Sequence, residues 1–163
     1  LAAEGCHVAM CDVIQENMEE TFKIVSKECR NVKVTKHICD VSDEEQVLQF
    51  KDEVIDQHDT SVINLLFNNA GIGGGGSFVE GSREEWERCF AVCWYGVYYC
   101  SRAFMDYIVA SDEGHIINTS SINGFWATLN GVPHTMASSS VVTRPKTSVP
   151  LMSRPAAPAK WIS

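Results

Sequence analysis

Hydrophobic and polar positions along the first 121 residues form alternating blocks that are typical of strands and helices. Short apolar runs predict strands at residues 7–11, 32–38, 62–67 and 115–119. Between them, helical spacing brings apolar side chains onto single faces: Met18, Phe22 and Val25 within residues 15–29, and Val47, Phe50, Val54 and Ile55 after Ser42. Strands that alternate with amphipathic helices predict βα units and a parallel sheet. Residues 32–38 alternate apolar with polar side chains, so we expect this strand near an edge of the sheet.

Two helix starts carry a capping-box pattern, in which a Ser and a Glu three positions later satisfy each other's backbone N–H groups. Ser42 with Glu45 predicts the first start, and Ser82 with Glu85 the second. The helix that starts after Ser82 is long, and its apolar positions recur at helical spacing: Trp86, Cys89, Phe90, Cys93, Val97 and Cys100.

Polar and small residues follow two of the predicted strands. Asn68, Asn69, Ala70 and Gly71 come directly after the run 62–67, and Ser120 and Ser121 follow the run 115–119. Ligands of parallel sheets bind at the carboxyl ends of the strands, so these residues predict one crevice. The alternative for 68–71 is an ordinary Asn-Gly turn leading into the glycine loop 73–76.

These motifs stand in an order that resembles the short-chain dehydrogenase/reductase family of nicotinamide-dependent oxidoreductases, over residues 1–135. The resemblance rests on the helix end at 1–5, the strand closing on Asp12, the turn 39–41, the signature 68–71 and the segment 118–124. It implies an α/β fold with a doubly wound parallel sheet of the Rossmann type, incomplete here. Residues 1–135 would form a partial dinucleotide-binding domain, and residues 136–163 an irregular Pro-rich tail.

The resemblance also implies roles for single residues. Asp12 would accept hydrogen bonds from the adenosine ribose hydroxyls, which favours NAD over NADP because a phosphate there would face a carboxylate. Asp40 and Val41 would contact adenine. Helix capping is the alternative for both aspartates. The remaining cofactor residues, which would line the ribose, are Asn69, Ala70 and Gly71.

Ser121 would be the catalytic serine that hydrogen-bonds the substrate oxygen, while a tyrosine moves the proton and a lysine lowers that tyrosine's pKa. An ordinary serine at a strand end is the alternative. The sequence departs from the family here, because Tyr-x-x-x-Lys occurs nowhere in it; Ala137 and Val141 stand at those positions. Cys93 stands where the family has an asparagine, and a thiol is a poor substitute for an amide.

The family's first strand and its glycine-rich phosphate loop would lie before Leu1. In the doubly wound order that strand separates the second strand from the fourth. We therefore expect the strands at 7–11 and 62–67 to lack a partner between them, and the fold to be marginal unless the sheet closes up.

Composition fits one soluble domain of 163 residues, which we expect to be cytoplasmic because no signal peptide or membrane-spanning run is present. The net charge of −8, without a basic stripe, argues against nucleic acid. Seven cysteines without Cys-x-x-Cys predict reduced thiols and no metal site. The helix 83–109 could join a homo-oligomer through Trp86, Trp94, Tyr98 and Tyr99, or these side chains could be core.

Three interpretations of this chain stay open. The chain could be part of a working NAD-dependent enzyme that interconverts an alcohol and a carbonyl. It could be a non-catalytic member of the family that binds a nucleotide or pairs with a full-length relative. It could also be a gene remnant that does not fold stably. Because Tyr-x-x-x-Lys is missing, we expect no dehydrogenase activity from the sequence as it stands.

Overall fold

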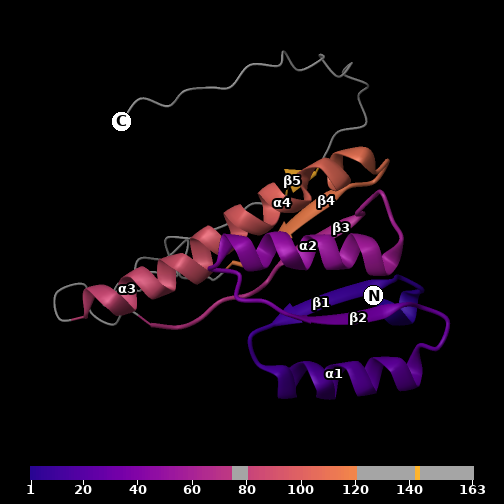
Figure 1. Ribbon diagram of the computed structural model, residues 1–163, viewed down its shortest axis with the longest axis horizontal. Coiled ribbons are helices and arrows are strands. Elements are labelled where there is room, and N and C mark those ends of the chain that lie inside the picture. Colours follow the sequence, from indigo (N-terminus) through magenta and orange to yellow (C-terminus); the bar gives the residue numbers. More distant parts are fainter. Residues whose placement is uncertain (75–80, 121–141, 144–163) are drawn as a thin grey trace, which may run out of the picture.

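A computed structural model describes residues 1–74, 81–120 and 142–143 of the chain, in which strands and helices alternate as the sequence pattern predicts (Figure 1). The strands are β1 (Val8–Asp12), β2 (Val34–Ile38), β3 (Leu65–Asn68), β4 (His115–Asn118) and β5 (Val142–Thr143). The helices are α1 (Gln15–Glu28), α2 (Glu44–His58), α3 (Arg83–Phe90) and α4 (Gly96–Ala110), with a 3-10 turn η1 (Ala2–Glu4) and a π-helical turn η2 (Ala91–Tyr95). The α/β fold class is confirmed.

The described strands form two separate sheets. β1 pairs in parallel with β2, and β3 pairs in parallel with β4, which also pairs antiparallel with β5. β2 is an edge strand within these residues, as its alternating pattern predicts. No backbone ladder joins β1 to β3 in the part of the chain described, so the sheet has not closed up where the sequence predicts a gap.

Helices cover both sides of the first sheet. α1 and α2 lie on opposite sides of β1 and β2, and α4 runs beside α2 against β3 and β4 (Figure 1). The core lies between α2, α4 and the strands, and the Phe50 ring meets the Phe104 ring edge-on at 5.6 Å between centroids. The buried members of this core are Cys39, Val41, Val47, Phe50, Val54, Cys100, Phe104, Ile108 and Ile116. The apolar side chains of α2 thus pack in one core with residues from both sheets.

The N-cap of α2 differs from the sequence prediction. Asp43, not Ser42, caps the helix, because Asp43 Oδ1 accepts from the amides of Glu45 and Gln46 at 2.9 and 3.2 Å. The Ser42 hydroxyl instead donates to Asp40 Oδ1 at 2.7 Å. A serine engaged in the preceding turn is not available as a cap, whereas the next residue offers a carboxylate.

The long helix predicted from Ser82 onward is present, and Ser82 caps it by accepting from the Glu85 amide at 3.2 Å. The helix contains one feature that the pattern does not predict, the π turn η2 between α3 and α4. A π turn is wider than an α turn, and such turns often lie at functional sites.

β3 is less buried than its apolar run predicts. Leu65 and Phe67 are 39% and 47% exposed, while Leu66 packs against the core and Asn68 is buried. Successive side chains of a strand point to opposite faces, and α4 covers one face of β3. Within the described residues nothing buries Leu65 and Phe67 on the other face, so β3 is covered on one face only.

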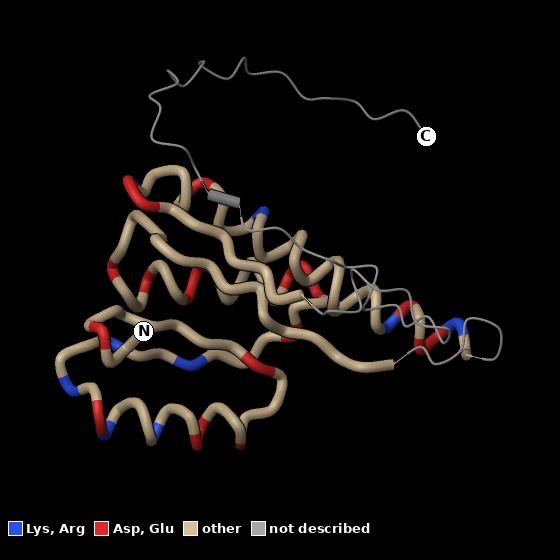
Figure 2. The backbone as a smooth tube through the Cα atoms, turned by 180° about the vertical axis from the view of Figure 1, so that it is seen from behind, with Lys and Arg blue, Asp and Glu red and all other residues tan. Residues whose placement is uncertain are grey.

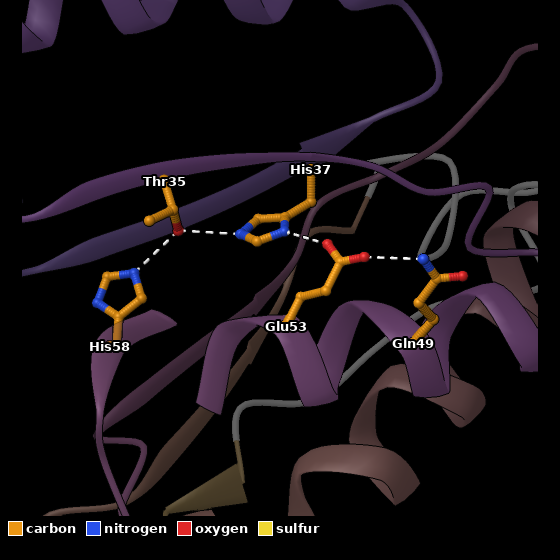
Figure 3. Close-up of polar contacts among 5 residues, drawn as sticks. All are labelled: Thr35, His37, Gln49, Glu53 and His58. Carbon is orange, nitrogen blue, oxygen red and sulfur yellow. Dashed lines mark hydrogen bonds and ion pairs between the residues drawn. The ribbon is translucent and has the colours of Figure 1, made fainter. Parts of the chain in front are cut away.

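A polar network joins β2 to α2 (Figure 3). His37, whose side chain is 1% exposed, has its Nδ1 2.7 Å from Glu53 Oε2 and its Nε2 3.0 Å from the Thr35 hydroxyl. The same hydroxyl lies 2.9 Å from His58 Nε2, and Gln49 donates to Glu53 Oε1 at 2.8 Å. The network satisfies both ring nitrogens of a buried histidine.

Charged residues lie along the outer helices, where Lys and Arg are scattered among more numerous Asp and Glu (Figure 2). In the described segments no helix combines the length and the apolar character needed to cross a bilayer.

Candidate functional site

A pocket of about 240 Å³ opens at the carboxyl ends of β3 and β4. Both strands run in the same direction, so the residues that follow them meet at one edge of the sheet. Helix η2–α4 supplies the opposite wall. The lining residues are Asn68, Asn69, Ala70, Gly71, Ile72, Gly73, Cys93, Val97, Thr119 and Ser120. The structure therefore brings the predicted residues Asn69, Ala70 and Gly71 together in one concave site.

Side-chain hydrogen bonds fix the two strand ends that shape the pocket. Asn68 is 8% exposed, and its amide donates to Asn118 Oδ1 at 2.7 Å and to the Ser101 hydroxyl at 3.0 Å. One residue past the end of each strand, the Thr119 hydroxyl donates to Asn69 Oδ1 at 2.7 Å. The side chains of Asn68 and Asn69 therefore link the carboxyl end of β3 to β4 and to α4 beside the pocket.

Small residues leave the pocket floor open to a ligand. Ala70 and Gly71 are exposed, and a methyl group built on Gly71 would meet only Cys93 Sγ, at 3.8 Å. A backbone without side chains can approach a sugar or a ring closely.

Asp12 lies at the end of β1, away from the residues that line the pocket. Its Oδ1 accepts from the Ile14 amide at 2.8 Å, which shapes the turn into α1. The helix itself has Ile14 as its N-cap without a side-chain bond, so the capping alternative for Asp12 takes the form of a turn before the helix. A carboxylate has two oxygens that can each accept more than one bond, so this turn leaves Asp12 able to accept from a ribose.

Asp40 and Val41 follow β2 and also lie outside the pocket lining. Asp40 Oδ1 accepts from the Ser42 amide and hydroxyl at 2.9 and 2.7 Å. Val41 is 8% exposed, and a methyl group on Gly96 would come within 2.7 Å of Val41 Cγ2. The Val41 side chain is thus committed to the core under α4, and only its backbone is left for contact with a base.

The pocket includes residues that the sequence pattern does not assign to it. The pattern predicts Thr119 as the last residue of a strand, whereas β4 ends at Asn118 and Thr119 lies beside Ser120 in the pocket. Cys93 replaces the asparagine of the family, and its thiol also forms a wall of the pocket beside Cys89. Their i, i+4 spacing on one helix is the signal that could have revealed this pair.

Ser121, the predicted catalytic residue, lies outside the described residues, as do Ala137 and Val141 at the family's tyrosine and lysine positions.

The seven cysteines form no disulfide, and the described residues gather no group of three His, Cys, Asp or Glu side chains that could hold a metal. Burial raises the pKa of Cys100 to about 12. The hydrogen bond to Cys39 and burial raise the pKa of the neighbouring Cys11 as well. These core thiols therefore stay protonated at neutral pH and are poor nucleophiles.

Known proteins share this arrangement. The family model described as short chain dehydrogenase matches residues 1–140. The human epidermal retinol dehydrogenase 2 is 31% identical over 134 residues, which are 82% of this chain and 42% of that protein. A crystal structure of a short-chain dehydrogenase/reductase from Burkholderia phymatum in complex with NAD superposes with a TM-score of 0.76 and 28% identity, covering 83% of this chain and 47% of the other. A metagenomic short-chain oxidoreductase in complex with NADP superposes with a TM-score of 0.74 and 27% identity, covering 83% and 60%.

The chain therefore spans about half the length of these relatives. The match includes both strand ends of the pocket and the helix that walls it, and its order of elements is the one that the sequence motifs predict. The chain belongs to the short-chain dehydrogenase family.

Proposed function

We propose that this chain binds NAD at the carboxyl edge of its strands and that the 163 residues alone do not transfer hydride. The protein of which it forms a part, or from which it derives, would interconvert an alcohol and a carbonyl compound. The observation that carries this proposal is the pocket formed by Asn69, Ala70 and Gly71 against Thr119 and Ser120.

The dimensions of the pocket favour part of a dinucleotide. Sites for drug-sized ligands usually measure about 300–1,000 Å³, so a pocket of about 240 Å³ suits a ribose or a single ring. Asp12 would hold the adenosine ribose beyond it, and the backbone of Val41 would face adenine. These residues fit the cofactor because they offer small side chains at the floor and an acceptor for ribose hydroxyls.

Bound NAD would supply the hydride acceptor. The chain would contribute Ser121, whose hydroxyl would donate a hydrogen bond to the substrate oxygen. The proton of the alcohol must also leave, and Ala137 and Val141 cannot accept it at the positions where the family has tyrosine and lysine. Binding without turnover is therefore the function that these residues support.

A titration of the purified chain with NAD, followed by calorimetry, tests binding. Asn69→Ala should weaken binding by a factor of about five, the equivalent of about 1 kcal/mol for one hydrogen bond. Asn31→Ala, an exposed Asn on a distant turn, is the matched control. Equal affinities of the two variants would count against this site.

NAD in preference to NADP is part of the same proposal, since solved relatives hold either cofactor. Asp12→Ser removes the carboxylate that would repel a 2′-phosphate, so it should weaken NAD binding and strengthen NADP binding. Asp56→Ser, at an exposed position of α2, should change neither. A wild-type chain that binds NADP more tightly than NAD would overturn this choice.

Lack of turnover is tested by oxidation of a panel of simple alcohols with NAD. We expect the same background rate for the wild-type chain and for Ser121→Ala. A rate clearly above that of the variant would refute the proposal of inactivity.

Pairing with a second protein is the other candidate function. The observation in its favour is a set of exposed aromatic side chains on one helix: Trp94, Tyr95 and Tyr98, each 48–51% exposed. Tyr99 instead packs against the core. Sedimentation of the wild type and of Trp94→Ser tests this function, and a monomer at all concentrations, alone and with a full-length family member, would argue against it.

A further inference from the structure

Two cysteine thiols converge on one backbone carbonyl beside the pocket. Cys89 lies on the buried side of α3 in its last turn, and Cys93 lies one turn further, in η2. The two sulfur atoms are 3.9 Å apart. Each thiol donates to the carbonyl oxygen of Ile72 at 3.6 Å. The pair therefore connects the helix to the loop 71–73, which forms the pocket floor.

The two thiols differ in access. Cys89 is 0% exposed, whereas Cys93 is half-buried and lines the pocket, with its sulfur 3.8 Å from the position of a methyl group on Gly71. A reagent that enters the pocket therefore meets Cys93 first. Cys89 can react only with a group already attached to Cys93.

We propose that Cys93 and Cys89 form a redox-sensitive pair, in which Cys93 reacts with a low-molecular-weight disulfide and Cys89 resolves the product. The Cys93 thiolate attacks one sulfur of the small disulfide, forms a mixed disulfide and releases one small thiolate. Cys89 gives its proton to the first small thiolate and attacks the Cys93 sulfur, which releases the second small thiolate. Two protein thiols are oxidised to one disulfide, and the small disulfide is reduced to two thiols.

The geometry requires a small local movement. Cβ atoms at i and i+4 on a helix are about 5–6 Å apart, whereas a disulfide needs about 3.5–4.5 Å. The required shift falls where the helix already leaves regular α geometry, because Cys93 belongs to the π turn η2.

The disulfide would change the pocket. A bonded Cys93 sulfur moves toward Cys89, and neither sulfur can still donate to the Ile72 carbonyl because both protons are gone. The loop 71–73 then loses two anchors, and we expect loss of NAD binding in the oxidised form. This last step rests on the proposed function, whereas formation of the disulfide does not.

Oxidised glutathione is the probe for the first experiment, with the whole chain incubated under native conditions and then alkylated. Chymotrypsin cleaves after Phe90 and Trp94, so a bond between Cys89 and Cys93 appears as two joined peptides that separate after reduction. The wild type should form this bond, Cys89→Ser should retain a glutathione adduct on Cys93, and Cys93→Ser should form neither. Cys29→Ser, a distant half-buried position at the end of α1, should behave as the wild type.

A second measurement needs no variant. Brief alkylation of the native wild type with iodoacetamide should modify Cys93 before Cys89, and NAD should protect Cys93. Alkylation of Cys89 first, or a glutathione adduct on Cys93 that never resolves, would overturn the pair.

NAD titrations of the reduced and oxidised wild type separate the two proposals. If the bond forms but neither form binds NAD, the thiol pair stands and the nucleotide proposal fails. If the reduced form binds NAD and no bond forms, the pair fails and the nucleotide proposal stands. Equal binding by both forms would refute the control of the pocket by oxidation.

Discussion

The side-chain amide of Asn68 donates to the side-chain oxygen of Asn118 across 2.7 Å, and this bond joins the ends of two parallel strands. Both hydrogens of the Asn68 amide are used, since the second goes to Ser101 on α4. A single buried side chain therefore fixes the sheet edge and the helix that together enclose the pocket.

Replacement of this side chain should destabilise the protein. Asn68→Ala removes the buried donor of two part-buried hydrogen bonds, to Asn118 and Ser101, which costs about 1–3 kcal/mol of the free energy of unfolding. Urea denaturation measures this loss, and Asn31→Ala is the exposed control. An unchanged urea midpoint for Asn68→Ala would show that water replaces both bonds.

Gly114 should not tolerate even a methyl group. A Cβ at this buried position would lie 2.1 Å from the backbone oxygen of Ile108, and a backbone atom cannot rotate away. We expect Gly114→Ala to cost about 1–3 kcal/mol, as overpacking generally does.

Gly73→Ala is the matched control for that substitution, because a methyl group there meets nothing within 4 Å. Thermal unfolding of the two variants should show a loss for Gly114→Ala alone. Equal melting temperatures would mean that the loop before β4 shifts at little cost.

The identity of the α2 cap can be tested with a pair of neighbouring substitutions. Asp43→Ala should lower the urea midpoint more than Ser42→Ala, because Asp43 accepts from two helix amides and Ser42 from none of them. The reverse order would support the cap that the sequence pattern predicts. Circular dichroism would show whether the loss is helical.

The network between β2 and α2 predicts a dependence of stability on pH. Hydrogen bonds from His37 and Gln49 hold the pKa of Glu53 below 4.5. A carboxyl whose pKa is lower in the folded state binds fewer protons there than in the unfolded chain, so its stabilisation is full above pH 4.5 and is lost as the pH falls through its folded value. Burial, with the charge of Lys33, lowers the pKa of His58 below 6.5. The folded state therefore favours the neutral ring, so this stabilisation is full above pH 6.5 and is lost as the pH falls through the folded-state pKa.

Unfolding in urea should therefore become easier as the pH falls, first below pH 6.5 and again below pH 4.5. His58→Gln should flatten the upper step and Glu53→Gln the lower one. If both variants kept the slope of the wild type, the pH dependence would have to arise elsewhere in the chain.

The elements and their order could be predicted from the sequence because each rests on a local periodicity. The stripe of α2 and the apolar run of β4 lie where the pattern places them, and Ser82 caps its helix as predicted. The sequence predicts Asn69, Ala70 and Gly71 at a strand end, which fixes their position in any parallel sheet.

Features that depend on neighbours in space could not be predicted in the same way. The exposure of Phe67 depends on which elements cover the second face of β3, and the choice of Asp43 as cap depends on the bond that Ser42 makes to Asp40. The wide turn η2 has no pattern of its own, so the convergence of Cys89 and Cys93 on the carbonyl oxygen of Ile72 emerges only in three dimensions.

The gap between β1 and β3 affects how the molecule interacts with other protein chains. Within the described residues β1 has β2 as its only strand neighbour, and β3 has β4. A strand edge with unpaired N–H and C=O groups is a template for any extended chain, and the exposed Leu65 and Phe67 stand beside one such edge. Within the described residues this edge is therefore the place where an extended strand from another molecule would add to the sheet.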